Sequence, residues 1–275
     1  MLASLLIVFR EVFEAGLLVG IVMAVTTGVA GRGLWITGGV VAGVLGACLV
    51  ALFTGGLSEL FGGSGQEVFN AGILSFAVIM LTWHNVWMAR HGRELAAELK
   101  AAGEAVASGS KSLAALAIVV AIAVLREGSE VVLFLYGVAA SQGGASWGML
   151  MGGVIGLILG SLVCLMTYVG LITIPARYLF SVTSTLIAFL AAGLAAQAIA
   201  FLQQADILTA LDQTVWDTSW ILSDSSYLGR ALHTLIGYVD QPTAMQLIVY
   251  AATLTVMVVL MKLFSAPPAQ RPRTA

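Results

Sequence analysis

Seven long runs of apolar residues, separated by short polar stretches, account for most of the chain. They cover residues 2–25, 34–54, 68–88, 113–138, 147–169, 178–202 and 244–263. A helix rises about 1.5 Å per residue and the hydrocarbon core of a bilayer is about 30 Å thick, so each run is long enough to cross it. The pattern predicts an all-α integral membrane protein with seven transmembrane helices.

The composition agrees with this fold class, because 60% of the 275 residues are hydrophobic and only 9% are charged. The lipid bilayer is therefore the first expected partner. The formal net charge of −2 provides no basic groove, so nucleic-acid binding is not expected. Cys48 and Cys164 both lie within apolar runs and give neither a disulfide framework nor a metal-binding spacing.

We expect a single transmembrane domain over residues 1–264, followed by a disordered cytoplasmic tail over 265–275. The domain divides into a first repeat (1–90), a cytoplasmic linker (91–112), a second repeat (113–203), an outer loop (204–241) and a seventh helix (242–264). Within the linker, residues 93–100 are typical of a short amphipathic helix. The first apolar run has no basic residues before it, so it is expected to be retained and not cleaved as a signal peptide.

The distribution of lysine and arginine predicts the orientation. With the N-terminus outside, nine of the twelve basic residues fall on the cytoplasmic side, only Arg230 falls outside, and the other two lie within membrane runs. We therefore expect a multi-pass plasma-membrane protein with a cytoplasmic C-terminus. The same orientation places seven of the ten acidic residues outside the motifs on the outer face, where they would attract cations.

An internal repeat appears when the sequence is compared with itself at a shift of 116 residues. Arg10, Glu11 and Glu14 then align with Arg126, Glu127 and Glu130, and the ungapped match continues to Cys48 and Cys164. The first three helices would thus correspond to the next three. Because three spans is an odd number, the two halves would enter the membrane from opposite sides, as in many secondary transporters. The seventh helix stands outside this 3+3 inverted repeat.

The repeated string Arg-Glu-x-x-Glu places charges near the middle of two membrane runs, at Arg10, Glu11 and Glu14 and again at Arg126, Glu127 and Glu130. An ionisable residue at bilayer depth costs roughly 2.5 to 3.5 kcal/mol even on lenient insertion scales. In each string the two glutamates share one helix face, and the arginine lies one turn before the second glutamate. Four carboxylates and two guanidiniums would leave the site about two charges negative, which demands a cation.

The alternative interpretation is structural, in which each string is an intrahelical salt bridge that helps the two helices recognise each other. It is disfavoured because a structural pair needs one glutamate per arginine, whereas each string supplies two. Carboxylate oxygens with no nearby thiolate favour hard ions over copper or zinc. The absence of Glu-x-x-His argues against a di-iron oxidase.

Other acidic and aromatic residues carry weaker predictions. Glu59, Glu67, Asp217 and Asp224 would form an outer vestibule that concentrates cations, although solvated surface acids are the more common explanation. Trp83, His84 and Asn85 lie toward the inner end of the third run, where an interfacial anchor is expected in preference to an exit ligand.

With these motifs in the first and fourth of seven spans, the chain resembles the high-affinity iron permease family of oxidase-dependent iron transporters. The stretch from 216 to 238 also resembles the segment before the last helix in bacterial members, which implies the inner membrane. The resemblance implies import of iron, as Fe3+ after oxidation outside, with Glu11, Glu14, Glu127 and Glu130 as ligands in passage. It also implies an extracytoplasmic protein that oxidises or delivers iron. Where family members often carry glycine and leucine inside the motif, this chain has Val12-Phe13 and Gly128-Ser129, which are not ligand positions.

Several alternatives stay open at this level. The chain could carry another metal cation such as Pb2+, act as a metal sensor or structural subunit, or use its carboxylates as a membrane-embedded enzyme. We expect no enzyme, no permanently bound cofactor and no ATP-driven pump, because no nucleophile arrangement or phosphate-binding loop is present in the sequence. The sequence does not decide whether the protein is a monomer or a homo-oligomer. It also does not decide whether transport is driven by the membrane potential alone or also by proton exchange.

Overall fold

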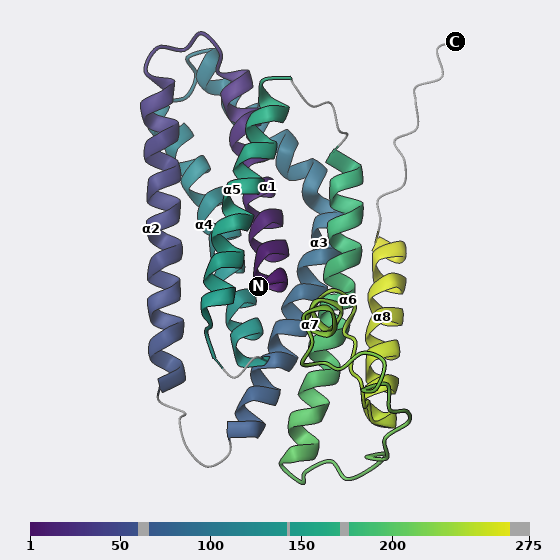
Figure 1. The fold of residues 1–275 in the computed structure, drawn as a ribbon. Coiled ribbons are helices and arrows are strands. Elements are labelled where there is room, and N and C mark those ends of the chain that lie inside the picture. Colours follow the sequence, from purple (N-terminus) through teal and green to yellow (C-terminus); the bar gives the residue numbers. More distant parts are fainter. Residues whose placement is uncertain (60–65, 142–143, 171–175, 265–275) are drawn as a thin grey trace, which may run out of the picture.

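The computed structural model describes residues 1–59, 66–141, 144–170 and 176–264, and these residues form an arrangement of helices without a strand. The predicted tail at 265–275 lies outside the described residues. In chain order the helices are α1 (Leu2–Val25), α2 (Arg32–Glu59), α3 (Gln66–Ala107), α4 (Leu113–Ser141), α5 (Trp147–Tyr168), α6 (Ala176–Gln204), α7 (Tyr227–Ile236) and α8 (Ala244–Phe264). Figure 1 shows the long helices side by side, with α7 lying against α6.

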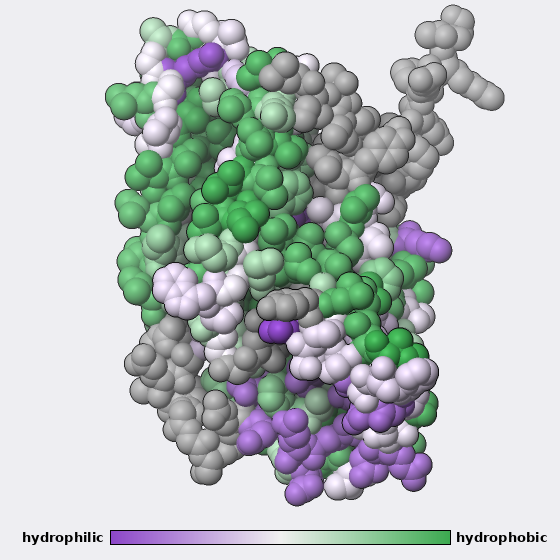
Figure 2. All heavy atoms as spheres, viewed as in Figure 1, coloured by the Kyte–Doolittle hydropathy of each residue, from purple (hydrophilic) through white to green (hydrophobic). Residues whose placement is uncertain are grey.

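Five of these helices, α2, α3, α5, α6 and α8, contain a segment that is long and apolar enough to cross a membrane, counted over the described residues. The other two long helices have 24 and 29 residues and differ mainly in carrying three charged residues each in their middle. Large apolar side chains are exposed along the outside of the bundle, and Figure 2 shows this apolar band with hydrophilic residues gathered at the lower end. The prediction of an all-helical, multi-pass membrane protein agrees with this structure.

Two differences from the expected elements concern the segments between spans. Helix α3 runs without a break from the third apolar run through the predicted linker helix, and it ends at Ala107 before Gly109, whose φ of 77° closes the turn. The outer loop contains a helix, α7, that was not predicted. Ser226 caps α7 by accepting a hydrogen bond from the Gly229 amide (2.9 Å), and Gly237 ends it with a φ of 69°.

The order of packing does not follow the order of the chain. Helix α2 packs along α4, and α5 packs along α1, while α3 lies against α6 and α6 against α8. As a result α1 and α4 become neighbours in the centre, with α3 touching both. This exchange places the two helices that carry the charged motifs next to each other.

Glycines allow the two exchanged pairs to approach closely. A Cβ added at Gly43 in α2 would lie 2.8 Å from the Ala121 carbonyl oxygen of α4, and one added at Gly156 in α5 would lie 2.5 Å from the Leu5 carbonyl oxygen of α1. Leu5 and Ala121 are 116 residues apart, as the repeat predicts, whereas the two glycines are 113 apart. Small residues of this kind are the usual means by which membrane helices approach each other.

The difference of three residues corrects one detail of the ungapped alignment. Gly160 of α5 faces Val12 of α1, and Ala47 of α2 faces Gly128 of α4 in the same way. Gly160 and Ala47 are again 113 residues apart. By the same spacing Cys164 corresponds to Ala51, and not to Cys48 as the uniform shift predicted. Under the predicted repeat, the first half would therefore contain three additional residues between its first and second helices.

Two apolar clusters fill the inside of the bundle. One includes Ile7, Leu74 and Phe134, and the other includes Val22, Leu99 and Val120. The charged motifs lie between the two clusters along α1 and α4, because residues 10–14 and 126–130 separate the members that each helix contributes. The polar site is therefore enclosed from both ends by packed apolar side chains.

The close packing of α5 on α1 leads to a direct test. We expect Gly156→Ala to lower the free energy of unfolding by about 1 to 3 kcal/mol, because the added methyl group meets backbone and neither helix can retreat without breaking other contacts. The matched control is Gly153→Ala in the same helix, where an added Cβ meets only Val8 Cγ2, at 3.9 Å. Unfolding in mixed detergent micelles, followed by tryptophan fluorescence, measures both. Equal stability of the two variants would contradict this packing.

Candidate metal site

The four glutamates of the two motifs face a common region between α1 and α4. Glu11, Glu14 and Glu127 are each 1–2% exposed, and the side chain of Glu130 is 14% exposed. One carboxylate oxygen from each of Glu11, Glu127 and Glu130 lies within 4.8 Å of the other two. The three-residue spacing within each helix and the contact between the helices bring these groups together, so the structure places all four predicted ligands in one cluster.

Each arginine pairs with the second glutamate of its own motif, one helical turn away. Arg10 Nε donates to Glu14 Oε1 at 2.7 Å, and Arg126 Nε donates to Glu130 Oε1 at 3.3 Å. The two environments differ. The Arg10 side chain is 1% exposed, whereas that of Arg126 is 33% exposed and stacks on the Trp87 ring, 3.8 Å from its centroid. Arg10 is thus the more tightly enclosed of the two cations.

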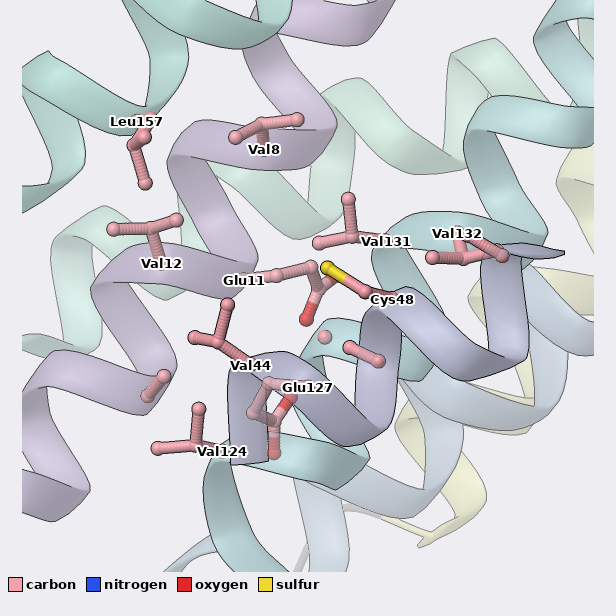
Figure 3. Close-up of a pocket in the computed structure, with 14 residues that line it drawn as sticks. Val8, Glu11, Val12, Val44, Cys48, Val124, Glu127, Val131, Val132 and Leu157 are labelled. Atoms are coloured by element: carbon pink, nitrogen blue, oxygen red, sulfur yellow. The ribbon is translucent and has the colours of Figure 1, made fainter. Parts of the chain in front are cut away.

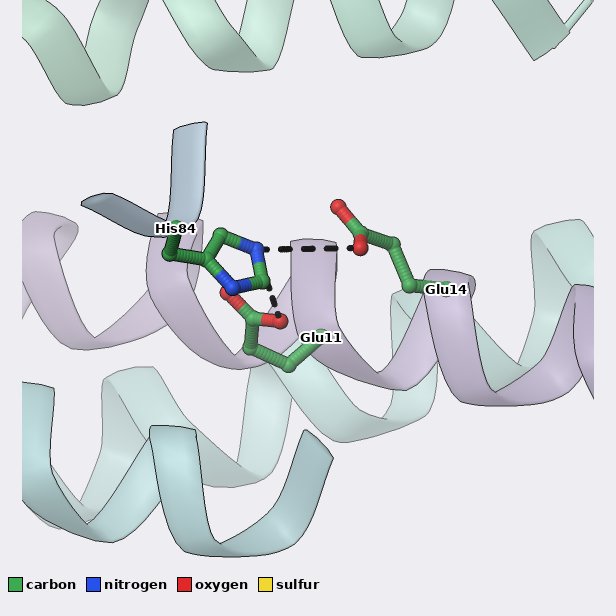
Figure 4. Close-up of side chains that lie close together, drawn as sticks. All are labelled: Glu11, Glu14 and His84. Carbon is green, nitrogen blue, oxygen red and sulfur yellow. Dashed lines mark ion pairs between the residues drawn. The ribbon is translucent and has the colours of Figure 1, made fainter. Parts of the chain in front are cut away.

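His84 of α3 also faces the carboxylates, which the sequence analysis did not predict. Its Nε2 lies 3.9 Å from Glu11 Oε2 and 3.8 Å from Glu14 Oε2, as Figure 4 shows. Its Nδ1 is paired with Glu130 Oε2. With an exposure of 2%, His84 is a buried member of the cluster, so its expected role as an interfacial anchor was wrong.

Of the two neighbours of His84, one is exposed on the outside of the bundle and the other is buried inside it. Trp83 is 66% exposed on the outside of the bundle, where an interfacial or lipid-facing position is consistent with the anchor prediction. Asn85 is 1% exposed, and its Nδ2 donates to the Ser184 carbonyl of α6 at 3.4 Å. The sequence contained a signal for the buried position of His84. Leu74, Ala77, Leu81 and His84 follow one another at intervals of three or four and form the buried face of α3.

Several of the clustered oxygens accept no hydrogen bond. This holds for both oxygens of Glu11, both oxygens of Glu127 and Glu14 Oε2. Buried polar atoms of this kind are costly, and a carboxylate is the costliest. With four carboxylates and two guanidiniums ionised and His84 neutral, the cluster carries a formal charge of −2. A cation bound among these oxygens would satisfy both their lone pairs and their charge.

A cavity of about 290 Å³ reaches the cluster from the side of α2 and α5, opposite to α3. Glu11 and Glu127 line it, as Figure 3 shows, and the rest of its wall is almost entirely apolar. Its lining residues come in pairs that are 116 apart in α1 and α4, including Val8 with Val124 and Glu11 with Glu127. The cavity therefore lies between corresponding faces of the two motif helices.

The predicted outer vestibule is not assembled in the same way. The Glu59 side chain lies outside the described residues, and Glu67 is exposed at the start of α3. Ser219 and Gln241 donate hydrogen bonds to the exposed Asp217, which lowers the pKa of its carboxyl. Burial raises the pKa of Asp224. Groups of three potential ligands occur, within the described part of the chain, only in the cluster of α1, α3 and α4.

This combination of fold and site defines a class. Apolar helices that expose their side chains to lipid, with ionisable groups buried among them, are typical of multi-pass membrane transporters that carry ions.

The chain belongs to the iron permease FTR1 family, whose description matches residues 1–267. It is 34% identical to the ferrous iron permease EfeU of Yersinia pestis over 98% of this chain and 94% of that protein. Proteins with the same name from Escherichia coli O6:H1 and Shigella sonnei are 33% and 32% identical, covering 91% and 98% of this chain and 91% and 96% of theirs. No solved structure matches. The protein is thus a membrane permease and not an enzyme, as the sequence predicted.

The different burial of the two arginines leads to a prediction. We expect Arg10→Gln to lower the free energy of unfolding by about 3 to 5 kcal/mol, because it leaves the Glu14 and Glu11 carboxylates buried without a counter-charge. For Arg126→Gln, with its partly exposed pair, we expect about 1 kcal/mol or less. Unfolding of the purified variants in detergent measures the difference. Equal losses would show that the two motifs are equally enclosed, against the structure.

Proposed function

We propose that this protein imports iron across the plasma membrane through a site at the bilayer midplane built from the two Arg-Glu-x-x-Glu motifs. The observation that carries the proposal is the meeting of four carboxylates between α1 and α4, three of them buried, with several oxygens that lack hydrogen-bond partners. Membership of the iron permease family is the reason for proposing iron as the substrate. Iron is here the transported ion, and the proposal includes no permanently bound cofactor.

The proposed architecture has seven spans, α1 to α6 and α8, with the first six arranged as two inverted repeats. Its support is the exchanged packing, in which α2 lies on α4 just as α5 lies on α1, with matching glycine contacts in both pairs. In an inverted repeat the two motif helices cross the membrane in opposite directions. Each motif lies near the middle of its own helix, so both would meet at half depth.

The proposed orientation has the N-terminus outside and the C-terminus in the cytoplasm, in the inner membrane of a bacterium. It is supported by the excess of lysine and arginine in the connections on the opposite side from the α7 segment. An inside-negative potential contributes about 2.3 kcal/mol per charge per 100 mV, so it would favour inward movement of Fe2+ or Fe3+. Proton exchange by the clustered carboxylates would be an additional coupling.

Two oxidation states are candidates for the ion that crosses. Resemblance to oxidase-dependent transporters predicts Fe3+, and hard carboxylate oxygens are consistent with it. The relatives with 32–34% identity are named ferrous iron permeases, which favours Fe2+. In either case an extracytoplasmic protein that oxidises or delivers iron is the proposed partner. Another metal ion, such as Pb2+, is the main alternative substrate.

Uptake of labelled iron into proteoliposomes under an inside-negative potential tests the proposal. We expect Glu14→Gln and Glu127→Gln each to lower initial uptake by roughly tenfold or more, because each removes a charged oxygen ligand while keeping the shape. Fe2+ under reducing conditions and chelated Fe3+ are supplied in separate experiments.

The matched control for this experiment is Glu104→Gln, which removes an exposed carboxylate whose partner is Lys100 at 3.8 Å. It should transport like the unmodified protein. Full uptake by correctly inserted Glu14→Gln and Glu127→Gln variants would reject the proposed site. Uptake of Pb2+ but of neither iron species would reject the proposed substrate.

The orientation has its own test. In a variant with Cys48 and Cys164 replaced by alanine, a single cysteine is introduced as Ser225→Cys or as Ser110→Cys. A membrane-impermeant maleimide added to intact cells or spheroplasts should label the first and not the second, because Ser225 belongs to the α7 side and Ser110 to the opposite turn. The reverse pattern of labelling would invert the proposed topology.

A further inference from the structure

We propose that His84 Nε2 is a direct ligand of the transported ion, together with Glu11 and Glu14, and that Glu130 orients the imidazole. The inference rests on the proposed function and names a ligand and a source of selectivity at the same site. It assigns the ion one nitrogen donor in addition to carboxylate oxygens.

The position of His84 supports direct ligation. One carboxylate oxygen of Glu11, one of Glu14 and one ring nitrogen of His84 all lie within 4.8 Å of one another, and all three residues are buried. Distances of 3.8 and 3.9 Å between Nε2 and the two oxygens are longer than hydrogen bonds. Two ligand atoms that each lie about 2 Å from a metal can be up to about 4 Å apart, so these distances leave room for one ion between Nε2 and each oxygen.

Glu130 provides the orientation that a ligating histidine needs. Its Oε2 is paired with Nδ1 of His84, while its Oε1 accepts the hydrogen bond of Arg126. A carboxylate on Nδ1 holds the proton there, so that Nε2 keeps its lone pair for a metal. Metal-bound histidines are commonly oriented by a carboxylate in this way. Glu130 would then act through His84 when the ion lies between Glu11 and Glu14.

The nitrogen donor changes which ions the site prefers. A site of carboxylates alone suits Ca2+, Mg2+ and Mn2+ as well as iron, whereas imidazole favours later transition metals. His84 would therefore help the permease to accept Fe2+ while excluding more abundant hard divalent ions. This selectivity would come from one half of the chain only, because α6 contains no histidine.

A spectroscopic experiment tests ligation without relying on transport. The chain has only three histidines, so a full-length variant with His91→Gln and His233→Gln, purified on a tag without histidine, retains His84 as its sole imidazole. Vanadyl ion, VO2+, serves as a paramagnetic divalent probe, and pulsed electron paramagnetic resonance detects nitrogen coordinated to it. We expect a nitrogen coupling that disappears when His84→Gln is added. Glu14→Gln, added instead, should weaken vanadyl binding itself.

A competition experiment tests selectivity. We expect His84→Gln to reduce the preference of uptake for Fe2+ over Mn2+ by roughly tenfold, the scale on which metal affinity responds to a lost interaction in such sites. His91→Gln is the control, because His91 stacks on Trp87 and belongs to neither group of potential metal ligands. Glu130→Gln should produce part of the same change, since it releases the imidazole from its orientation.

The two proposals fail in different ways. If vanadyl binding depends on Glu14 but shows no nitrogen coupling, and competition by Mn2+ is unchanged in a folded His84→Gln variant, the role of His84 is rejected while the iron site stands. If Glu14→Gln leaves iron uptake intact, the proposed function fails whatever His84 does.

Discussion

The ion pair between Arg10 and Glu14 is the interaction on which the rest of the structure depends. It lies almost completely out of reach of solvent, in a helix that is otherwise mostly apolar. Arg10 Nε is 2.7 Å from Glu14 Oε1, and Nη1 of the same guanidinium is 3.8 Å from Glu11 Oε1, so one cation serves two carboxylates. Removing such charges from water costs several kcal/mol per ion, and partial pairing does not recover that cost. Glu11 and Glu127 therefore present buried oxygens that have no hydrogen-bond partner. A permease needs this property, because a site whose carboxylates were already fully satisfied would have no free energy to offer an entering cation.

Enclosing these groups requires close helix packing around them. The contacts of Gly43 with α4 and of Gly156 with α1 bring the backbones together, so that α1 and α4 are each covered on one side by a partner from the other half of the chain. The apolar clusters around Ile7 and Val22 then close the site at both ends. Glycine contacts, apolar clusters and buried ionisable groups are thus interdependent: in the proposed permease the carboxylates would provide the binding site, and the packing around them limits their contact with water.

Much of this could be predicted from the sequence, because the relevant signals are local. Apolar runs predict helices, the intervals between Arg10, Glu11 and Glu14 fix their common face, and the pairing of each arginine with the glutamate four residues later follows from helical geometry. The rest depends on how helices pack. The inward position of His84 follows from the side of α3 that meets α1 and α4, and the shift from 116 to 113 follows from backbone contacts of Gly43 and Gly156. Helix α7 was missed because a short helix in a polar loop has only its caps, Ser226 and Gly237, as a local signal.

The two halves of the site are related but not equivalent, and the difference lies in what surrounds each motif. Arg10 is enclosed, whereas Arg126 stacks on Trp87 and remains one-third exposed. Both Trp87 and His84 come from α3, and α6 supplies neither a histidine nor a tryptophan. A site with two identical halves would present the same ligands to an ion from either side. With the imidazole supplied by α3 alone, the glutamates of α1 and those of α4 form two different environments, so in the proposed mechanism an ion that moved from one pair to the other would change its ligands as it advanced. The proposed inverted repeat would in this way give the permease a symmetric framework together with a directional path.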